Sequence, residues 1–189
     1  MGITQASIDR LNKHKLIKKC DMLELGAQNT YDKRNYGKIA KDFFKSYGIN
    51  HTSWDITPHQ GAIAMDLRQP IEVKKEYDIV TDYGTTEHVS GDYYMAHLNI
   101  HNHTKKGGII IHENPKTGHW IGHGCNYVNK AFYTALAALC NYEIIELTEE
   151  YAMGNTVDGC NICVVMRKLS DNEFIDLDTF NSIGNVFAK

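Results

Sequence analysis

The stretch Met22-Leu23-Glu24-Leu25-Gly26-Ala27-Gln28 is an apolar run with one acidic residue that breaks at a glycine and leads into a polar turn. This pattern is typical of a buried strand that delivers its carboxyl end to a ligand in an open α/β sheet. Many buried strands end at a glycine, so the stretch is informative only together with the strand ends later in the chain. Asp55 closes a second strand-like run, Asp66 closes a third, and Tyr83-Gly84 closes a fourth. Since the carboxyl ends of parallel strands meet at one edge of a sheet, these strand ends predict one cofactor cleft.

Apolar runs of strand length alternate with longer segments of helical period, which predicts an α/β fold with a mainly parallel sheet covered on both faces. The predicted helices are residues 4–18, 36–47, 89–104 and 126–139, and the predicted strands are 22–25, 51–56, 62–65, 77–81, 109–112, 142–147 and 161–167. Residues 149–159 are predicted to connect the last two strands.

Length and composition predict one folded domain. The chain has 189 residues, of which 42% are hydrophobic, enough for one well-buried core and too few for two ordinary domains. We expect residues 1–189 to form a single cofactor-binding domain, with an N-terminal helix within 1–19. The C-terminal tail, 170–189, carries enough apolar residues, Val186 among them, to fold back on the domain or to meet a second subunit in a homodimer.

Charge and cysteine content restrict the classes of partner and compartment. A net charge of −3 gives no general attraction to nucleic acid or to anionic membranes, so neither is favoured as a partner. No run of 18 apolar residues and no signal peptide is present, and we expect a cytoplasmic protein. Five cysteines fit reduced thiols better than a disulfide framework. Cys160 and Cys163 are three apart on a predicted strand, face opposite sides, and are expected to be packing thiols.

The residues at the ends of the predicted strands resemble the motifs of class I S-adenosylmethionine-dependent methyltransferases, and the resemblance covers residues 21–168. The matching phrases are Leu23-Glu24-Leu25-Gly26, Asp55, Asp66-Leu67, Tyr77-Asp78-Ile79-Val80-Thr81 running into Thr86-Glu87-His88-Val89, and Lys106-Gly107-Gly108. The resemblance implies a Rossmann-like, seven-stranded sheet whose last strand is antiparallel, with S-adenosylmethionine as the cofactor. The family usually has a second glycine where this chain has Gln28, whose amide is a candidate contact for the methionine end of the cofactor.

The residue types at the strand ends suit a nucleoside. A carboxylate at a strand end can accept both protons of a ribose diol, which is the role predicted for Asp55, and capping of the Thr57-Pro58 turn is the alternative. Asp66 could accept from an adenine amino group while Leu67 packs on the ring, or could cap the turn before Pro70. The predicted cofactor-binding residues are Glu24, Gly26, Gln28, Asp55, Asp66, Leu67, Tyr83 and Gly84. Glu24 needs a partner if it is buried, either the ligand's ammonium group or a lysine or arginine.

Histidines supply the candidates for acid–base chemistry. A sulfonium is already an activated leaving group, so the protein must align a small-molecule acceptor and, for a hydroxyl, remove its proton. The candidate catalytic residues are His88, His112, His119 and His123, because they lie on strand ends and on the glycine-bearing loop 118–124 where an acceptor enters. The acceptor atom is expected to be oxygen, as in a sugar or glycan. His97 and His101 stack on a predicted helix and are expected to be solvated.

The pair Glu87-His88 raises the question of whether the chain binds a metal ion. The resemblance implies a role near the methyl donor, and a subset of the family uses such a pair, with a further glutamate three residues earlier, to hold a divalent cation. Gly84 occupies that earlier position, so we expect no metal. The alternative is a glutamate in the first turn of a helix with a packed histidine. Two other functions stay open, a nucleoside-binding module without catalysis and a metal-dependent hydrolase, which would need three converging ligands.

Overall fold

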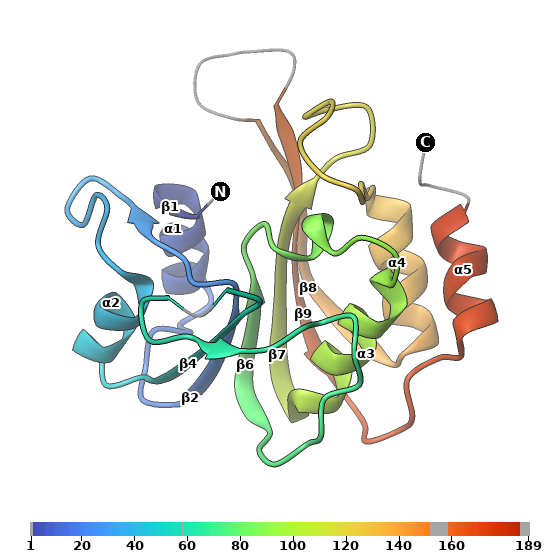
Figure 1. Ribbon diagram of the computed structural model, residues 1–189, viewed down its shortest axis with the longest axis horizontal. Coiled ribbons are helices and arrows are strands. Elements are labelled where there is room, and N and C mark those ends of the chain that lie inside the picture. The colour runs from blue at the N-terminus through green and yellow to red at the C-terminus, as the bar shows by residue number, and fades with distance from the viewer. Residues whose placement is uncertain (1, 58, 152–158, 186–189) are drawn as a thin grey trace.

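The computed structural model describes residues 2–57, 59–151 and 159–185 (Figure 1). Within these ranges seven strands form one sheet in the order β5-β4-β2-β6-β7-β9-β8. The strands are β2 Asp21–Leu25, β4 Asn50–Asp55, β5 Ile63–Ala64, β6 Tyr77–Asp82, β7 Thr104–Pro115, β8 Tyr142–Tyr151 and β9 Cys160–Lys168. Strands β5, β4, β2, β6 and β7 pair in parallel, whereas β9 runs antiparallel to both of its neighbours. The predicted mainly parallel α/β sheet with an antiparallel last strand is confirmed.

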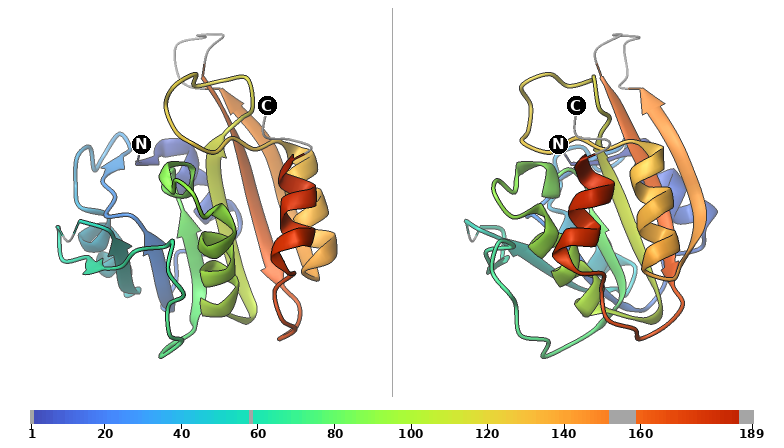
Figure 2. Two further views of the ribbon diagram at one scale, coloured as in Figure 1. Left: turned by 45° about the vertical axis from the view of Figure 1, so that its right-hand side comes forward. Right: turned by 90° about the vertical axis from the view of Figure 1, so that its right-hand side faces the viewer.

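Helices cover both faces of the sheet (Figures 1 and 2). On β6, Ile79 packs under α1 (Gln5–Lys13) and α2 (Ala40–Ser46), while its neighbour Val80 packs under α3 (Tyr93–His103), α4 (Lys130–Leu139) and α5 (Leu177–Asn185). On β7, Ile109 and Ile111 face the first group and Ile110 faces the second. Side chains alternate between the faces of a strand, so runs of consecutive apolar residues fill both cores at once.

The order of the strands creates a crevice beside β2. From β2 the chain runs outward through β4 to β5 and then returns to β6 on the other side of β2. The connections therefore diverge between β2 and β6, and in open α/β sheets the space outside the carboxyl ends at such a switch point is where ligands bind. A short two-stranded sheet of β1 (Ile3–Thr4) and β3 (Thr30–Tyr31) and a 3-10 turn, η1 (Thr86–His88), complete the described elements.

Helices α2, α3 and α4 each begin four residues later than predicted, and in α3 and α4 a capping residue sets the first turn. The Asp92 side chain accepts from the Met95 N–H at 2.8 Å and starts α3, and Asn129 accepts from the Phe132 N–H at 3.0 Å and starts α4. Asn126, the predicted start of α4, instead donates its amide to the backbone carbonyl of Val89 at 2.8 Å. The segment before α4 is thereby tied to the end of η1.

The C-terminal tail folds back on the domain, one of its two predicted arrangements. Phe174 and Phe180 are buried in the core that α3 and α4 share. All five cysteines are free, and Cys160 and Cys163 are buried, as expected for packing thiols. The predicted connection 149–159 lies mostly outside the described residues, and so does residue 186. No helix within the described ranges is long and apolar enough to cross a bilayer.

Candidate functional site

A cavity of about 440 Å³ lies at the carboxyl ends of β2, β4, β5 and β6. We call it the switch-point pocket. Its lining combines residues that come after β2 with residues that come after β6, the two strands between which the connections diverge. Of the predicted cofactor-binding residues it contains Gly26, Gln28, Asp55, Asp66, Leu67 and Gly84, and it adds Ala27, Trp54, Ile56, Met65, Arg68, Thr85, His88, Val89 and Ser90. The fold thus brings four separate strand ends to one cavity.

Glycine is required at position 26 by both conformation and space. Gly26 has φ +78°, in the left-handed region. A Cβ built there would lie 2.5 Å from Thr85 Oγ1 and 2.7 Å from Gln28 Nε2. These two side chains join across the pocket wall, because the Gln28 amide donates to Thr85 Oγ1 at 3.1 Å and the Thr85 hydroxyl donates to the Leu25 carbonyl at 2.8 Å. The glycine therefore permits a close connection between the loops after β2 and β6.

Asp55 ties the end of β4 to the loop after β2. Its Oδ2 accepts from the Ala27 N–H at 2.9 Å, and its Oδ1 accepts from the Thr57 N–H at 2.9 Å. The turn-capping role is thus present, although Pro58 lies outside the described residues. Each carboxylate oxygen has a further lone pair, so these two bonds leave acceptor capacity toward the pocket. The ribose-binding role stays a prediction.

Asp66 lies at the rim of the pocket and is paired with Arg68. The guanidinium Nη2 lies 2.7 Å from Asp66 Oδ2, and hydrogen bonding from Arg68 lowers the pKa of Asp66 to about 2. Leu67 is buried and packs into the core beneath α3. A ligand amine at this rim would meet a carboxylate that is ionised and shared with an arginine.

Two predicted cofactor residues do not line the pocket. The Tyr83 side chain is buried in the core under α1 and α2, because the residue after β6 points to the opposite face from Gly84, and it does not line the pocket. Glu24 is buried as well, and its Oε2 lies 3.4 Å from both the backbone nitrogen of Gln28 and His51 Nε2. Burial raises the pKa of Glu24, and hydrogen bonding from His51 partly opposes that effect. The basic side chain nearest to Glu24 is therefore His51 of β4 and not a lysine or arginine, and the predicted contact with a ligand's ammonium group stays a prediction.

A buried polar network lies behind η1, and its central residue, Asp82, was not among the predicted site residues. Asp82 Oδ2 accepts from His112 Nδ1 at 2.9 Å, from Thr86 Oγ1 at 2.5 Å and from Asn114 Nδ2 at 3.1 Å. The Tyr133 hydroxyl donates to Asn114 Oδ1 at 2.6 Å. The sequence signal for Asp82 was an acidic residue ending an apolar strand, one position before the Tyr83-Gly84 pair.

His112 belongs to this network and not to the cleft edge, where it was predicted. It is 1% exposed, and the ring packs against those of His97 and Tyr133. No acceptor can reach a ring enclosed in this way, which argues against His112 as the base. His97 and His101 are also buried rather than solvated as predicted, because His97 packs against Phe180 of α5 and His101 packs against Phe174 in the segment before α5.

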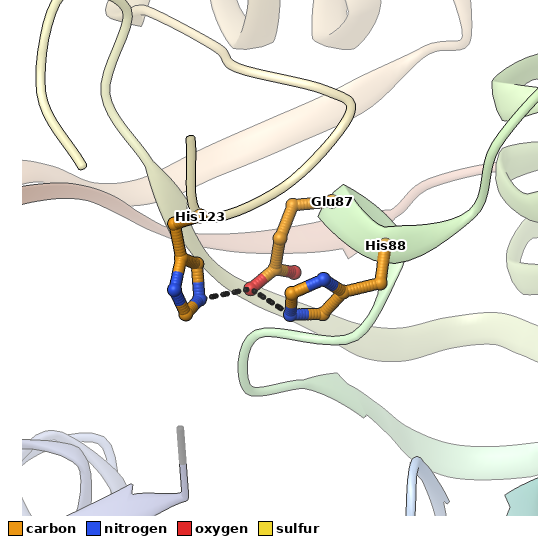
Figure 3. Close-up of side chains that lie close together, drawn as sticks. All are labelled: Glu87, His88 and His123. Carbon is orange, nitrogen blue, oxygen red and sulfur yellow. Dashed lines mark ion pairs between the residues drawn. The ribbon is translucent and has the colours of Figure 1, made fainter. Parts of the chain in front are cut away.

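Glu87, His88 and His123 converge beside the switch-point pocket (Figure 3). The ligand atoms of the three side chains lie within 4.8 Å of one another. Glu87 Oε1 is 3.6 Å from His88 Nε2 and 3.8 Å from His123 Nε2. Burial and the charge of Asp82 raise the pKa of Glu87 to about 8, and burial lowers the pKa of His88. Two histidines predicted as acid–base candidates are therefore neighbours, and His88 also lines the pocket.

His119 is the remaining acid–base candidate. Its ring lies 6.0 Å from that of Tyr151, on the side of the loop where β8 ends, and it is not part of the pocket lining. The structure therefore separates His119 from His88 and His123, although its role as a base stays a prediction.

Solved structures with this fold include several methyltransferases. The 1,6-didemethyltoxoflavin-N1-methyltransferase of Burkholderia thailandensis, solved with S-adenosylhomocysteine, is 15% identical, with 88% of this chain and 78% of that chain covered and a TM-score of 0.64. The N-methyltransferase NodS of Bradyrhizobium japonicum, also solved with S-adenosylhomocysteine, is 14% identical, with 88% and 89% covered and a TM-score of 0.61. The [4+2]-cyclase SpnF is 13% identical, with 87% and 82% covered and a TM-score of 0.61.

These likenesses identify the class I methyltransferase fold, as the sequence motifs predicted. No protein-family model matches the chain, and no curated protein matches it. At this level of identity a shared fold does not carry a shared reaction, and the cyclase is an instance of the same fold with a different chemistry in its name. Function has to be argued from the pocket and its residues.

Proposed function

We propose that the chain binds S-adenosylmethionine in the switch-point pocket and transfers its methyl group to a small-molecule acceptor. The observation that carries the proposal is the position of the pocket, at the β2/β6 switch point with the Asp55 carboxylate at its edge. Two proteins of the same fold were solved with S-adenosylhomocysteine, the product of such a transfer. We propose further that residues 1–189 act as one S-adenosylmethionine-binding domain.

In this proposal each pocket residue contacts a different part of the cofactor. Asp55 accepts the two ribose hydroxyls, for which its carboxylate keeps free lone pairs. Leu67 offers an apolar surface to the adenine, and Asp66 accepts from its amino group. At Gly26 the missing side chain lets the methionine end pass close to the backbone, beside the Gln28 amide. In this assignment the side chains of Glu24 and Tyr83 make no direct contact with the cofactor.

The transfer step needs an aligned acceptor and, for a hydroxyl, a base. Positioning supplies most of the rate, since the sulfonium carries its own leaving group. His88 is the base in this proposal because it lines the pocket, is 48% exposed in its side chain, and has a pKa that burial and the charge of His123 lower. A neutral imidazole is the form that can take a proton. The acceptor atom is proposed to be oxygen, on a sugar or glycan.

Calorimetric titration with S-adenosylhomocysteine tests the proposal. We expect saturable binding by the wild type and no binding of NAD. Asp55→Ala should weaken the affinity by about 2–3 kcal/mol, or roughly 30- to 150-fold, because hydrogen bonds to a charged carboxylate are lost. Asp9→Ala, which removes an exposed carboxylate on α1, should leave the affinity unchanged. Absence of binding by the wild type would refute the proposal, and binding without transfer of a labelled methyl group to any hydroxyl compound would favour the nucleoside-binding module.

A further inference from the structure

The proposed cofactor contacts do not explain why the side chains of Glu87, His88 and His123 converge. Glu87 and His88 come from η1, and His123 comes from the loop 118–124, so the fold joins two segments that are distant in sequence. In Figure 3 both imidazole rings turn an Nε2 atom toward the same oxygen, Glu87 Oε1. One oxygen and two nitrogens therefore surround a common point.

The buried carboxylate has an oxygen that nothing in the described chain satisfies. The Glu87 side chain is 0% exposed, and its Oε1 accepts no hydrogen bond from any described group. Its Oε2 accepts from the Asn114 amide at 3.3 Å. The Nε2 atom of His123 is likewise buried without a hydrogen-bond partner among the described residues. Unsatisfied buried polar atoms are costly, and a cation between them would satisfy both at once.

The separations suit an ion between the groups. At 3.6 and 3.8 Å, the oxygen-to-nitrogen distances exceed the length of a direct hydrogen bond. Two ligand atoms each about 2.1 Å from one ion, at a tetrahedral angle, lie about 3.4 Å apart. All three ligand atoms lie within 4.8 Å of one another, so rotation of the two partly exposed histidine side chains toward a common ion would complete such a site.

The loop that carries His123 is fixed against Glu87. The backbone N–H groups of Cys125 and Asn126 both donate to the Glu87 carbonyl, at 2.7 and 3.0 Å. Gly124 permits this approach, because a Cβ there would lie 2.9 Å from the same carbonyl oxygen. The Tyr127 hydroxyl accepts from the His123 N–H at 3.1 Å and holds the turn. The third ligand is thus held in place by contacts that do not involve its own ring.

We propose that Glu87, His88 and His123 bind a single divalent transition-metal ion. Two imidazoles and one carboxylate suit Zn²⁺, Mn²⁺, Fe²⁺ or Co²⁺, whereas Mg²⁺ and Ca²⁺ prefer an all-oxygen set. Asn114 orients the carboxylate from behind, as the supporting residues of metal sites do. The expectation of no metal was based on Gly84, and the ligand that replaces the missing glutamate is His123.

The ion would lie at the mouth of the switch-point pocket. Three protein ligands leave at least one coordination position open. Because His88 lines the pocket, that position is available to an oxygen of a bound molecule. This last step rests on the proposed methyl transfer, whereas the ion site itself is independent of the reaction. With the ion bound, the Nε2 atom of His88 would be a ligand and could not take a proton. The ion, by binding the acceptor's oxygen and lowering the pKa of its hydroxyl, would then replace His88 as the activating group.

Titration of the full, chelator-treated chain with Co²⁺ and Zn²⁺ tests the site. The visible absorption of bound Co²⁺ reports its coordination directly, without an activity assay. We expect one equivalent of Co²⁺ to bind, Zn²⁺ to displace it, and Mg²⁺ at the same concentration to leave the spectrum unchanged. His123→Ala and His88→Ala, both at partly exposed side chains, should each weaken binding at least roughly tenfold. His119→Ala, in the same loop but outside the cluster, should not.

Failure of the site and failure of the proposed function are separable. No stoichiometric Co²⁺ or Zn²⁺ binding by the wild type would overturn the metal site, and so would equal loss in His119→Ala and His123→Ala. Displacement of Co²⁺ by Mg²⁺ would overturn the assignment to a transition metal. A parallel titration with S-adenosylhomocysteine examines the pocket alone, so metal binding without nucleoside binding would support the site while refuting the proposed function.

Discussion

Substitution of Gly26 by alanine should lower the free energy of unfolding by more than the cost of backbone strain alone, because it also crowds the pocket wall. The residue has φ +78°, a conformation that costs a residue with a Cβ about 1–2 kcal/mol. The added Cβ would also lie 2.5 Å from Thr85 Oγ1 and 2.7 Å from Gln28 Nε2, so one of these side chains must move. Loss of the Gln28–Thr85 hydrogen bond adds about 1 kcal/mol, for a total of about 2–3 kcal/mol. Denaturant titration measures the free energy of unfolding.

Gly48→Ala is the matched control for strain without crowding. Gly48 has φ +76°, and no atom lies within 4 Å of a Cβ built there. We expect it to lose about 1–2 kcal/mol of stability and to keep its affinity for S-adenosylhomocysteine. Gly26→Ala should lose about 1 kcal/mol more and bind that ligand at least roughly tenfold more weakly. Equal losses of stability and equal affinities in the two variants would refute the reasoning.

Two further predictions concern buried charge. Arg10→Met leaves the buried carboxylate of Glu113 without its cation and should cost about 3–5 kcal/mol of unfolding free energy, whereas Arg167→Met, which breaks an exposed pair, should cost less than about 1 kcal/mol. Similar losses of unfolding free energy in the two variants, measured by denaturant titration, would contradict the prediction that the buried pair contributes more than the exposed one. Burial lowers the pKa of His101 to about 4, whereas its pKa in the unfolded chain is near 6.5. The unfolded chain therefore takes up a proton first as the pH falls below about 6.5, and the folded state loses about 2 kcal/mol of stability by pH 5. His101→Gln should remove that part of the acid dependence, and an unchanged slope between pH 6.5 and 4 would count against it.

The parts of the fold that local patterns determine were predictable from the sequence. Strand β6 was expected at 77–81 and lies at Tyr77–Asp82, because its apolar run is bounded by charged residues on one side and a glycine turn on the other. The same local signals placed Asp55 and Gly84 at strand ends, and both line the pocket. Helix starts were less predictable, since α4 begins at Lys130 behind the Asn129 cap, while Asn126, the predicted start, bonds to carbonyls of a distant turn.

The parts of the site that depend on tertiary contacts were not predictable. The position of His112 at a strand end was correct, but its burial depends on Asp82 and Tyr133 packing around it from other elements. His123 and Glu87 meet because Gly124 permits the loop to touch η1, a contact with no local sequence signal. A homodimer stays a prediction, since the apolar tail that motivated it is partly buried within its own chain.

Chemical-shift mapping with S-adenosylhomocysteine tests most directly whether the nucleoside lies in the switch-point pocket. At 21.5 kDa the chain suits amide spectra of a ¹⁵N-labelled sample. We predict that the largest shifts fall on the amides of residues 26–28, 55–56, 66–68 and 84–85. A second cavity, of about 420 Å³ between α3, α4 and α5, provides the contrasting location. Shifts centred on Tyr94, Tyr127 and Phe180, with residues 26–28 and 55 unmoved, would contradict the assignment of the pocket.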